Sequence, residues 1–149
     1  MNTTYRLGFI GLGKMGRALW EGVCSTGIKA SYVEHPDFEP DGLSGDIIRL
    51  DLEACISQSD IVFLCVKPQQ MASVLSSIAT ISGFEKKYYI SIAAGVSLST
   101  YESVLGSFSM VCRVMPNTPV LVKEGMIALS FNDVVSNEFR QFSLDFFDS

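Results

Sequence analysis

The sequence predicts an α/β protein with a doubly wound, mostly parallel sheet, and three observations lead to that prediction. Short apolar runs of strand length alternate along the chain with longer segments that have helical spacing of apolar residues. Residues 61–66 are apolar without interruption, as expected of a strand covered on both faces. Gly11, Gly13 and Gly16 have the spacing Gly-x-Gly-x-x-Gly directly after the first apolar run. Together these features predict a single Rossmann-type domain over residues 1–149.

The first strand and the first helix flank the glycine motif. The helix is predicted over about residues 14–26, with apolar side chains on one side and Gly27 at its end. Gly11 suits the tight turn, Gly13 lets the backbone approach a pyrophosphate, and Gly16 allows the helix to pack on the strand. The positive end of the helix, with two basic side chains in its first turn, favours an anion. The motif predicts a dinucleotide site, and the alternative interpretation is a structural glycine turn.

The next elements continue the alternation. Residues 30–34 and 46–50 are predicted as the second and third strands, separated by a turn-rich stretch that contains proline, aspartate and glycine. A short helix at residues 51–59 leads to the apolar strand at residues 61–66, which we expect Pro68 to end.

The second half is predicted in the same way. Residues 69–81 have the apolar spacing of a helix, and residues 88–93 form a strand that ends at a turn of small residues. The chain then continues with a helix, a strand, a second strand and a final helix at residues 97–105, 109–115, 126–131 and 136–147. Phenylalanines gather on one face of the final helix, so we expect that face either to cover the core or to pack against residues outside the chain.

Composition excludes several function classes. The net charge of −5 provides no basic surface for a nucleic acid. The chain has no apolar run of membrane-spanning length and no hydrophobic leader, so we expect no membrane partner and a cytoplasmic location. The cysteines lack metal-ligand spacing, so we expect no metal site and four buried free thiols; they are Cys24, Cys55, Cys65 and Cys112.

Ligands of open α/β sheets bind outside the carboxyl ends of the strands, and the loops there carry the remaining motifs. These motifs are Val66-Lys-Pro-Gln69, Ile92-Ala-Ala-Gly-Val-Ser97 and Arg113-Val-Met-Pro-Asn-Thr-Pro119, the last followed by Glu124-Gly125. In order and spacing they resemble those of the pyrroline-5-carboxylate reductase family, and the resemblance to the N-terminal half of that family covers essentially the whole chain. The glycine motif alone is closer to the β-hydroxyacid dehydrogenases, but the later motifs favour the proline-pathway reductases.

The resemblance implies NADP or NAD as the cofactor and assigns residues to parts of it. Residues implied to hold the pyrophosphate are Ile10, Gly11, Leu12, Gly13, Lys14 and Met15. Residues implied to lie beside the nicotinamide ribose and ring are Cys65, Val66, Lys67, Pro68, Ala94 and Asn117. Structural interpretations stay open for four of these: a strand end for Pro68, a solvated charge for Lys67, packing for Ala94 and a turn for Asn117.

The choice between the two dinucleotides depends on Glu34 and His35. Many members of the family have serines or an arginine there, which suit the 2′-phosphate of NADP. Glu34 is placed to bind the ribose of NAD and would repel that phosphate, which favours NADH. His35, the single histidine, either donates to the phosphate or is an exposed loop residue before Pro36. The family favours NADPH, so the preference is left open.

By this resemblance the chain is the cofactor-binding domain of an enzyme that reduces 1-pyrroline-5-carboxylate to L-proline by hydride transfer from NAD(P)H. Members of the family continue with a helical domain for dimerisation and substrate binding, which we expect to be absent here. No residue qualifies as a general acid, so we name no catalytic residue and expect the isolated chain to be inactive. A homo-oligomer is expected only for the full-length enzyme. The alternatives are a β-hydroxyacid dehydrogenase-type oxidoreductase and a non-catalytic nucleotide-binding module.

Overall fold

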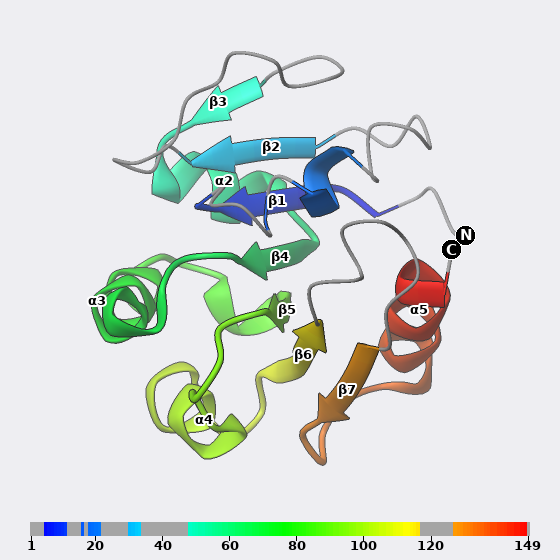
Figure 1. Cartoon of the computed structure of the whole chain (residues 1–149). Helices are drawn as coiled ribbons and strands as arrows, with labels where there is room; N and C mark the ends of the chain where they lie inside the picture. Colours follow the sequence, from blue (N-terminus) through cyan, green and yellow to red (C-terminus); the bar gives the residue numbers. More distant parts are fainter. Residues whose placement is uncertain are drawn as a thin grey trace.

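The computed structural model describes residues 5–11, 16, 18–21, 30–33, 48–116 and 127–148, and it has the predicted α/β architecture (Figure 1). The strands are β1 (Leu7–Ile10), β2 (Ala30–Val33), β3 (Ile48–Leu50), β4 (Ile61–Leu64), β5 (Tyr88–Ser91), β6 (Met110–Pro116) and β7 (Ile127–Phe131). The helices are α2 (Leu52–Gln58), α3 (Pro68–Ile78), α4 (Leu98–Leu105) and α5 (Asn137–Asp148), with a 3₁₀ turn at Phe84–Lys86. Residues 16 and 18–21 are also helical.

The seven strands lie in one sheet in the order β3-β2-β1-β4-β5-β6-β7. All neighbouring pairs are parallel except β6 and β7, so the sheet is mostly parallel and doubly wound, as predicted. The alternation of strand and helix predicted the parallel part. It did not predict the antiparallel pair, in which β7 returns beside β6. β7 is therefore an added edge strand rather than a further β-α-β unit.

Two apolar layers cover the two faces of the sheet. Trp20 and the phenylalanines of α5 pack on one face, around Phe9 and Phe63 of the central strands. Helices α2, α3 and α4 pack on the other face, where Val62 of β4 is among the buried residues. All four residues of β4 are buried, which explains why its sequence is apolar without interruption. The sheet thus has a core on both sides.

The final helix covers the core. Phe139, Phe142 and Phe146 are at most 9% exposed, and the ring of Phe139 stacks on Tyr88 with 4.5 Å between centroids. The interpretation that this face covers the core is therefore confirmed for these three residues. Cys55, Cys65 and Cys112 are buried free thiols, also as predicted, whereas Cys24 lies outside the described residues.

The end of β4 and the start of α3 differ from the predicted bounds for local reasons. The strand predicted at residues 61–66 ends at Leu64, because Cys65 and Val66 leave the ladder and turn toward α3. Pro68 does not simply end that strand, since it is the first residue of α3, a position where its missing N–H costs no hydrogen bond.

Among the described helices none is both long and apolar enough to cross a membrane.

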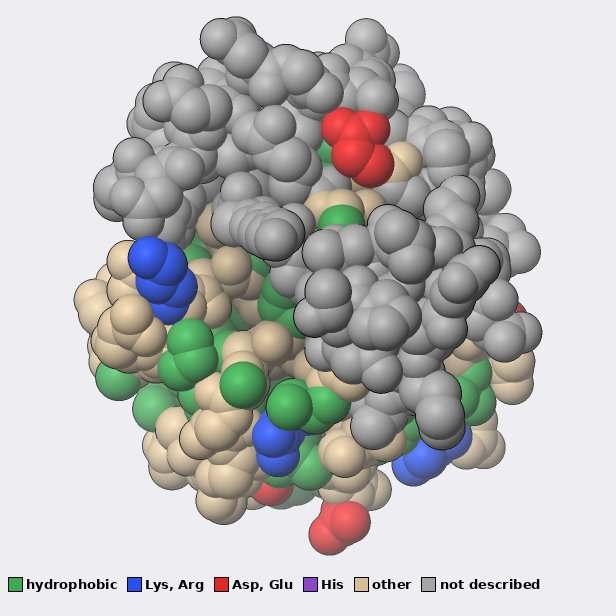
Figure 2. Space-filling view, viewed as in Figure 1, with side chains coloured by type: hydrophobic (Ala, Val, Ile, Leu, Met, Phe, Trp, Pro, Cys, Tyr) green, Lys and Arg blue, Asp and Glu red, His purple; other side chains and the backbone are tan. Residues whose placement is uncertain are grey.

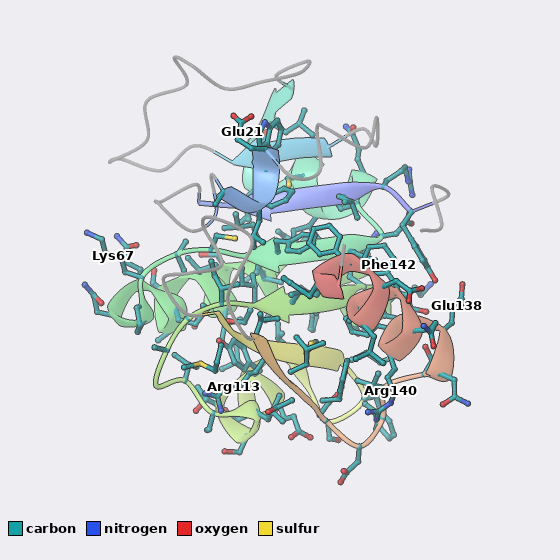
Figure 3. The ribbon with its side chains drawn as sticks, turned by 45° about the vertical axis from the view of Figure 1, so that its right-hand side comes forward. Glu21, Lys67, Arg113, Glu138, Arg140 and Phe142 are labelled. Atoms are coloured by element: carbon teal, nitrogen blue, oxygen red, sulfur yellow. The ribbon has the colours of Figure 1, made fainter. Side chains whose placement is uncertain are left out.

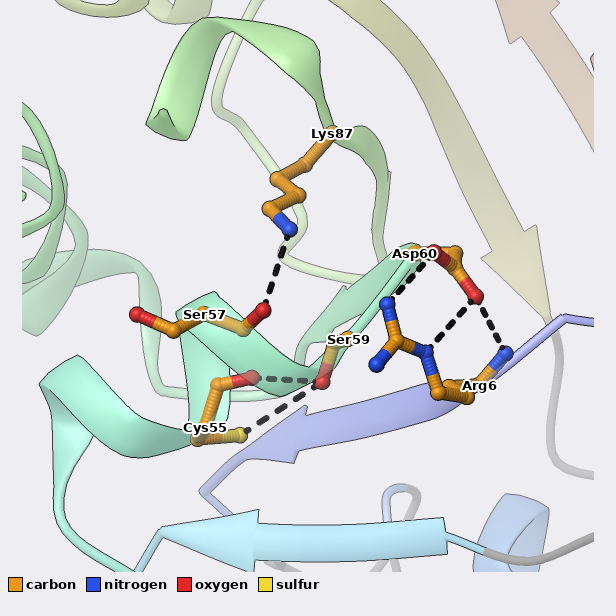
Figure 4. Close-up of polar contacts among 6 residues, drawn as sticks. All are labelled: Arg6, Cys55, Ser57, Ser59, Asp60 and Lys87. Carbon is orange, nitrogen blue, oxygen red and sulfur yellow. Dashed lines mark hydrogen bonds and ion pairs between the residues drawn. The ribbon is translucent and has the colours of Figure 1, made fainter. Parts of the chain in front are cut away.

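Polar contacts join the amino-terminal ends of the central strands, opposite the carboxyl ends (Figure 4). The backbone N–H of Arg6 donates to Asp60 Oδ2 at 2.7 Å, and its guanidinium donates to both carboxylate oxygens. In return the backbone N–H of Asp60 donates to the carbonyl of Arg6 at 2.7 Å. These contacts align the starts of β1 and β4, the two strands whose far ends form the candidate site.

Candidate cofactor-binding site

The strand order reverses between β1 and β4. β2 and β3 extend the sheet on one side of β1, and β4 to β7 extend it on the other. β1 and β4 are parallel neighbours, with Ile10 opposite Leu64 at their carboxyl ends. Gly11 follows β1 and Cys65 follows β4, so two of the predicted loops meet at this edge. A crevice outside such a reversal is where open α/β sheets bind ligands.

Gly11 and Gly16 both pack against the residues that follow β4. Gly11 has a φ of +79°, and a Cβ there would lie 2.9 Å from Val66 Cγ1 and 3.2 Å from the carbonyl oxygen of Cys65. A Cβ on Gly16 would lie 2.9 Å from Cys65 Cβ. Contacts this close would displace a backbone or a buried side chain, so both positions require glycine. The turn predicted for Gly11 and the close packing predicted for Gly16 are confirmed.

Cys65 joins the two loops by packing. Its backbone N–H donates to the carbonyl of Ile10 at 2.9 Å, and its side chain is 7% exposed. Burial raises the pKa of the Cys65 thiol well above its usual range, so the sulfur stays protonated. A protonated, buried thiol is a poor nucleophile, and the contacts of Cys65 hold the glycine turn against β4.

Lys67 and Pro68 begin α3 at the same edge. The carbonyl of Lys67 accepts from the backbone N–H of Gln70 at 2.9 Å, and Gln70 Oε1 accepts from the backbone N–H of Lys67 at 3.4 Å. Both Lys67 and Pro68 are exposed. Figure 3 shows Lys67 at the start of the helix, directed away from the strands. In this structure Lys67 therefore presents its charge outside the sheet edge rather than within the core.

Residues 93–95, named the Ala94 turn below, follow β5 at the same edge of the sheet. Ala93 is 5% exposed, whereas Ala94 and Gly95 are exposed. Packing against the described residues therefore does not account for Ala94, since its side chain is exposed among them. Gly95 has a φ of +77° and open space around its missing Cβ, so glycine is required there by conformation and not by crowding.

Two hydroxyls beneath the Ala94 turn were not predicted. Ser91 Oγ and Tyr101 Oη share a short hydrogen bond. Both residues are buried, with exposed fractions of 1% for Ser91 and 0% for Tyr101. Ser91 Oγ also accepts from the backbone N–H of Ala93 at 3.3 Å. The sequence signal that could have revealed this contact is Tyr101 on the apolar face of a helix, because a buried tyrosine hydroxyl needs a partner.

Arg113 lies on the neighbouring strand, level with Ser91. Its Nη2 is 3.8 Å from Met115 Sδ, and its buried Nε has no hydrogen-bond partner in the described structure. Burial raises the pKa of the Tyr101 phenol, while the hydrogen bond with Ser91 and the charge of Arg113 act in the opposite direction. The positive charge of Arg113, which is labelled in Figure 3, therefore acts on the buried hydroxyl of Tyr101.

Half of the predicted cofactor residues fall outside the described part of the chain. The residues outside it are Leu12, Gly13, Lys14, Met15, Glu34, His35 and Asn117. The described ones gather at one sheet edge, at the ends of β1, β4 and β5; they are Ile10, Gly11, Cys65, Val66, Lys67, Pro68 and Ala94. Their contact with a cofactor stays a prediction.

The surface around these elements has scattered charge. On the face shown in Figure 2, acidic and basic side chains of the described residues stand singly among apolar and neutral ones. Within residues 48–116 and the other described segments, no three histidine, cysteine, aspartate or glutamate side chains gather in a way that could hold a metal ion. The chemistry available at the described edge is therefore backbone N–H groups, small side chains and the cation of Lys67.

Comparison with known proteins gives one family match and many similar reductases. The family described as NADP oxidoreductase coenzyme F420-dependent matches residues 6–95, more than half of the chain. The pyrroline-5-carboxylate reductase of Methanosarcina acetivorans is 38% identical over 97% of this chain and 56% of its own length. The reductase of Pasteurella multocida is 34% identical over 92% of this chain and 53% of its own. The chain thus spans about half the length of the curated relatives it matches.

Solved structures agree with these relatives. The crystal structure of Plasmodium falciparum pyrroline carboxylate reductase with NADP bound superposes with a TM-score of 0.83 at 30% identity, covering 99% of this chain and 56% of that one. Glycerol-3-phosphate dehydrogenase of Coxiella burnetii has a TM-score of 0.80 at 13% identity over 99% of this chain and 52% of that one, which shows the shared fold alone. The chain belongs to the family described as NADP oxidoreductase coenzyme F420-dependent, and its resemblance to pyrroline-5-carboxylate reductases is confirmed.

Proposed function

We propose that the chain binds NADP(H) or NAD(H) at the carboxyl ends of β1 and β4, and that it is the cofactor-binding part of a reductase acting on 1-pyrroline-5-carboxylate. The observation that carries this proposal is the packing of Gly11 and Gly16 against Cys65 at the reversal of strand order. Such a turn brings backbone N–H groups close to a pyrophosphate at the start of a helix. The similarity to pyrroline-5-carboxylate reductases supports the substrate assignment.

In this proposal the dinucleotide lies along the ends of β1, β4 and β5. The turn at Gly11 would hold the pyrophosphate, and residues 65–68 would run beside the ribose and the ring. Exposed Ala94, in the turn that follows β5, would lie near the ring together with Asn117. When bound, the reduced nicotinamide supplies the hydride that reduces the imine carbon. The task of the chain is to fix the ring at contact distance and to exclude water from its face.

The relatives are about twice as long as this chain, so the remaining functions are assigned elsewhere. We place substrate binding, proton donation and dimerisation in a further domain of the protein. The small-molecule substrate is then the main partner, no nucleic acid or membrane is required, and the enzyme acts in the cytoplasm. The chain of 149 residues alone should bind the cofactor without turnover.

The proposal is tested by fluorescence titration of the chain with NADPH and, separately, with NADH. Saturable binding is the expected result. Tighter binding of NADH would indicate that Glu34 binds the ribose hydroxyls, and tighter binding of NADPH would indicate that His35 donates to the 2′-phosphate. Absence of binding at millimolar concentration of either dinucleotide would contradict the proposal and favour a structural glycine turn.

A pair of exposed lysines provides a matched control for the position of the ring. Lys67 lies at the start of α3, at the carboxyl ends of the strands and beside the proposed nicotinamide. Lys86 belongs to the 3₁₀ turn before β5 and so lies at the amino ends of the strands. Lys67→Ala should weaken dinucleotide binding a fewfold, and Lys86→Ala should leave it unchanged. Equal effects of the two substitutions would mean that Lys67 acts only through the overall charge.

A further inference from the structure

We infer that the buried hydroxyls of Ser91 and Tyr101, named the hydroxyl pair, are positioning groups that fix the Ala94 turn as a rigid wall for the nicotinamide ring. The inference rests on the proposed function, because it assigns the pair to the ring end of the same site. Neither residue would touch the ring itself. Their effect would pass through the backbone of residues 93–95.

The hydroxyl pair joins the end of a strand to the helix behind it. Ser91 is the last residue of β5 and Tyr101 lies one turn inside α4. The two hydroxyls bind each other in a site where both residues are almost fully buried, so water does not compete for the hydrogen bond. Ser91 Oγ then accepts from the backbone N–H of Ala93, which is the first residue of the turn. A single chain of contacts therefore runs from α4 to the turn.

The turn is fixed on both sides and open in the middle. The side chains of Ala93 and Val96 are buried in the core between the sheet and the helices α3 and α4, whereas Ala94 and Gly95 between them are exposed. The backbone N–H of Ile92, just before the turn, donates to the carbonyl of Leu64 at 3.3 Å. This bond joins the turn to β4, the strand that leads to Cys65. The exposed part of the turn thus borders the site and has little freedom to move.

Small size alone does not explain this arrangement. A turn of alanine and glycine lets a flat ring approach the backbone, but such residues also make a loop easily deformed. The hydroxyl pair supplies the constraint that the turn residues themselves lack. Removing the pair should therefore harm the placement of the ring and leave the distant phosphate and adenosine contacts intact.

The test compares ligands with and without the ring. Tyr101→Phe and Ser91→Ala are titrated with NADPH and with NADH. Competition titrations then measure the affinity for the fragments that lack nicotinamide, which are 2′-phospho-ADP-ribose for NADPH and ADP-ribose for NADH. We expect Tyr101→Phe to bind the preferred dinucleotide about three- to tenfold more weakly, the usual effect of one lost hydrogen bond. Ser91→Ala loses two hydrogen bonds and should bind at least as weakly as Tyr101→Phe. Affinity for the matching fragment without nicotinamide should stay within about twofold of wild type on the same basis. The double variant should behave as Ser91→Ala does, because that single change already removes the hydrogen bond that Tyr101→Phe removes.

Tyr89→Phe is the matched control. Tyr89 is on the same strand and in the same apolar layer, and its hydroxyl donates to the carbonyl of Phe84 at 2.6 Å, at the amino end of β5. Its loss should lower the melting temperature without changing affinity for either kind of ligand. An equal loss of affinity for the dinucleotide and the fragment in Tyr101→Phe, or no loss for either, would overturn the inference. Failure of the wild-type chain to bind any dinucleotide would overturn the proposed function and the inference with it.

Discussion

Gly11 and Gly83 have similar left-handed backbones in very different surroundings. Their φ angles are +79° and +86°, but a Cβ would be crowded only at Gly11 and would meet nothing within 4 Å at Gly83. Gly83→Ala should therefore lose about 1–2 kcal/mol of unfolding free energy from the backbone alone. Gly11→Ala should lose about 2–5 kcal/mol, because overpacking adds about 1–3 kcal/mol.

Urea unfolding of the two glycine variants measures this difference. Because the backbone contribution is common to both, the excess loss in Gly11→Ala reports the contact with Cys65 and Val66. Equal losses would mean that the loop after β4 moves to accommodate the added methyl group. The close packing at the proposed site would then contribute nothing measurable to the free energy of unfolding.

Asp60 gives the chain a dependence on acid. Burial acts to raise the pKa of Asp60, but the hydrogen bonds from Arg6 and the charges of Arg6 and Lys87 outweigh it, so the pKa lies below its usual range. A carboxyl group with a lower pKa in the folded chain contributes stability above the unfolded pKa of about 4, and that contribution is lost as the pH falls through the folded value. We expect the free energy of unfolding to fall at acid pH and to fall less steeply in Asp60→Asn.

Arg6→Gln provides the second measurement of that ion pair. Its free energy of unfolding should also fall less steeply at acid pH, but by less than in Asp60→Asn. The Asp60 carboxylate then loses the guanidinium and keeps the hydrogen bond from the backbone N–H of residue 6. The pair is partly exposed, with Arg6 63% accessible, so the effect is modest and should shrink further in high salt. Unchanged pH dependence in both variants would show that other carboxyl groups cause the loss.

At the scale of one element, α5 depends on its aromatic face. Phe139 is fully buried and stacks on Tyr88 of β5, whereas Leu144 on the same helix is 45% exposed. Phe139→Ala should cost about 3–5 kcal/mol, and Leu144→Ala should cost less than about 1 kcal/mol. Chemical unfolding of both variants checks this, and similar losses would mean that α5 does not pack on the sheet as described.

Most elements could be predicted from local pattern, because strands such as β1 and β4 are buried on both faces and amphipathic helices on one. What could not be predicted depends on contacts between distant segments. The direction of β7 is an example, since it is set by pairing with β6 and not by the residues of β7 themselves. The hydroxyl pair is another, because Ser91 and Tyr101 are unremarkable alone and gain a role only when β5 and α4 pack together. Spacing located the glycine turn, but it does not choose between NADH and NADPH.

At the scale of the whole molecule, the buried thiols can report how the cofactor stabilises the fold. Cys55, Cys65 and Cys112 are buried, so a thiol reagent should reach them in a Cys24→Ser chain only when the structure opens. A dinucleotide at about one hundred times its Kd stabilises the folded state by about 2.7 kcal/mol and should slow labelling about a hundredfold. The rate is followed by mass spectrometry. Labelling unaffected by a dinucleotide that binds would show that local openings away from the site expose these thiols.

Tyr5 contacts the final helix, and this has a consequence for how the chain acquires its structure. Its hydroxyl donates to Glu138, which lies 133 residues further along the chain, and its ring meets that of Phe142 at 5.1 Å between centroids. The central strand β1 likewise finds its second neighbour only at β4. Such distant pairings give a high contact order, and folding that must close long loops is slow. During synthesis on the ribosome, the core around β1 can therefore be completed only after α5 has been made.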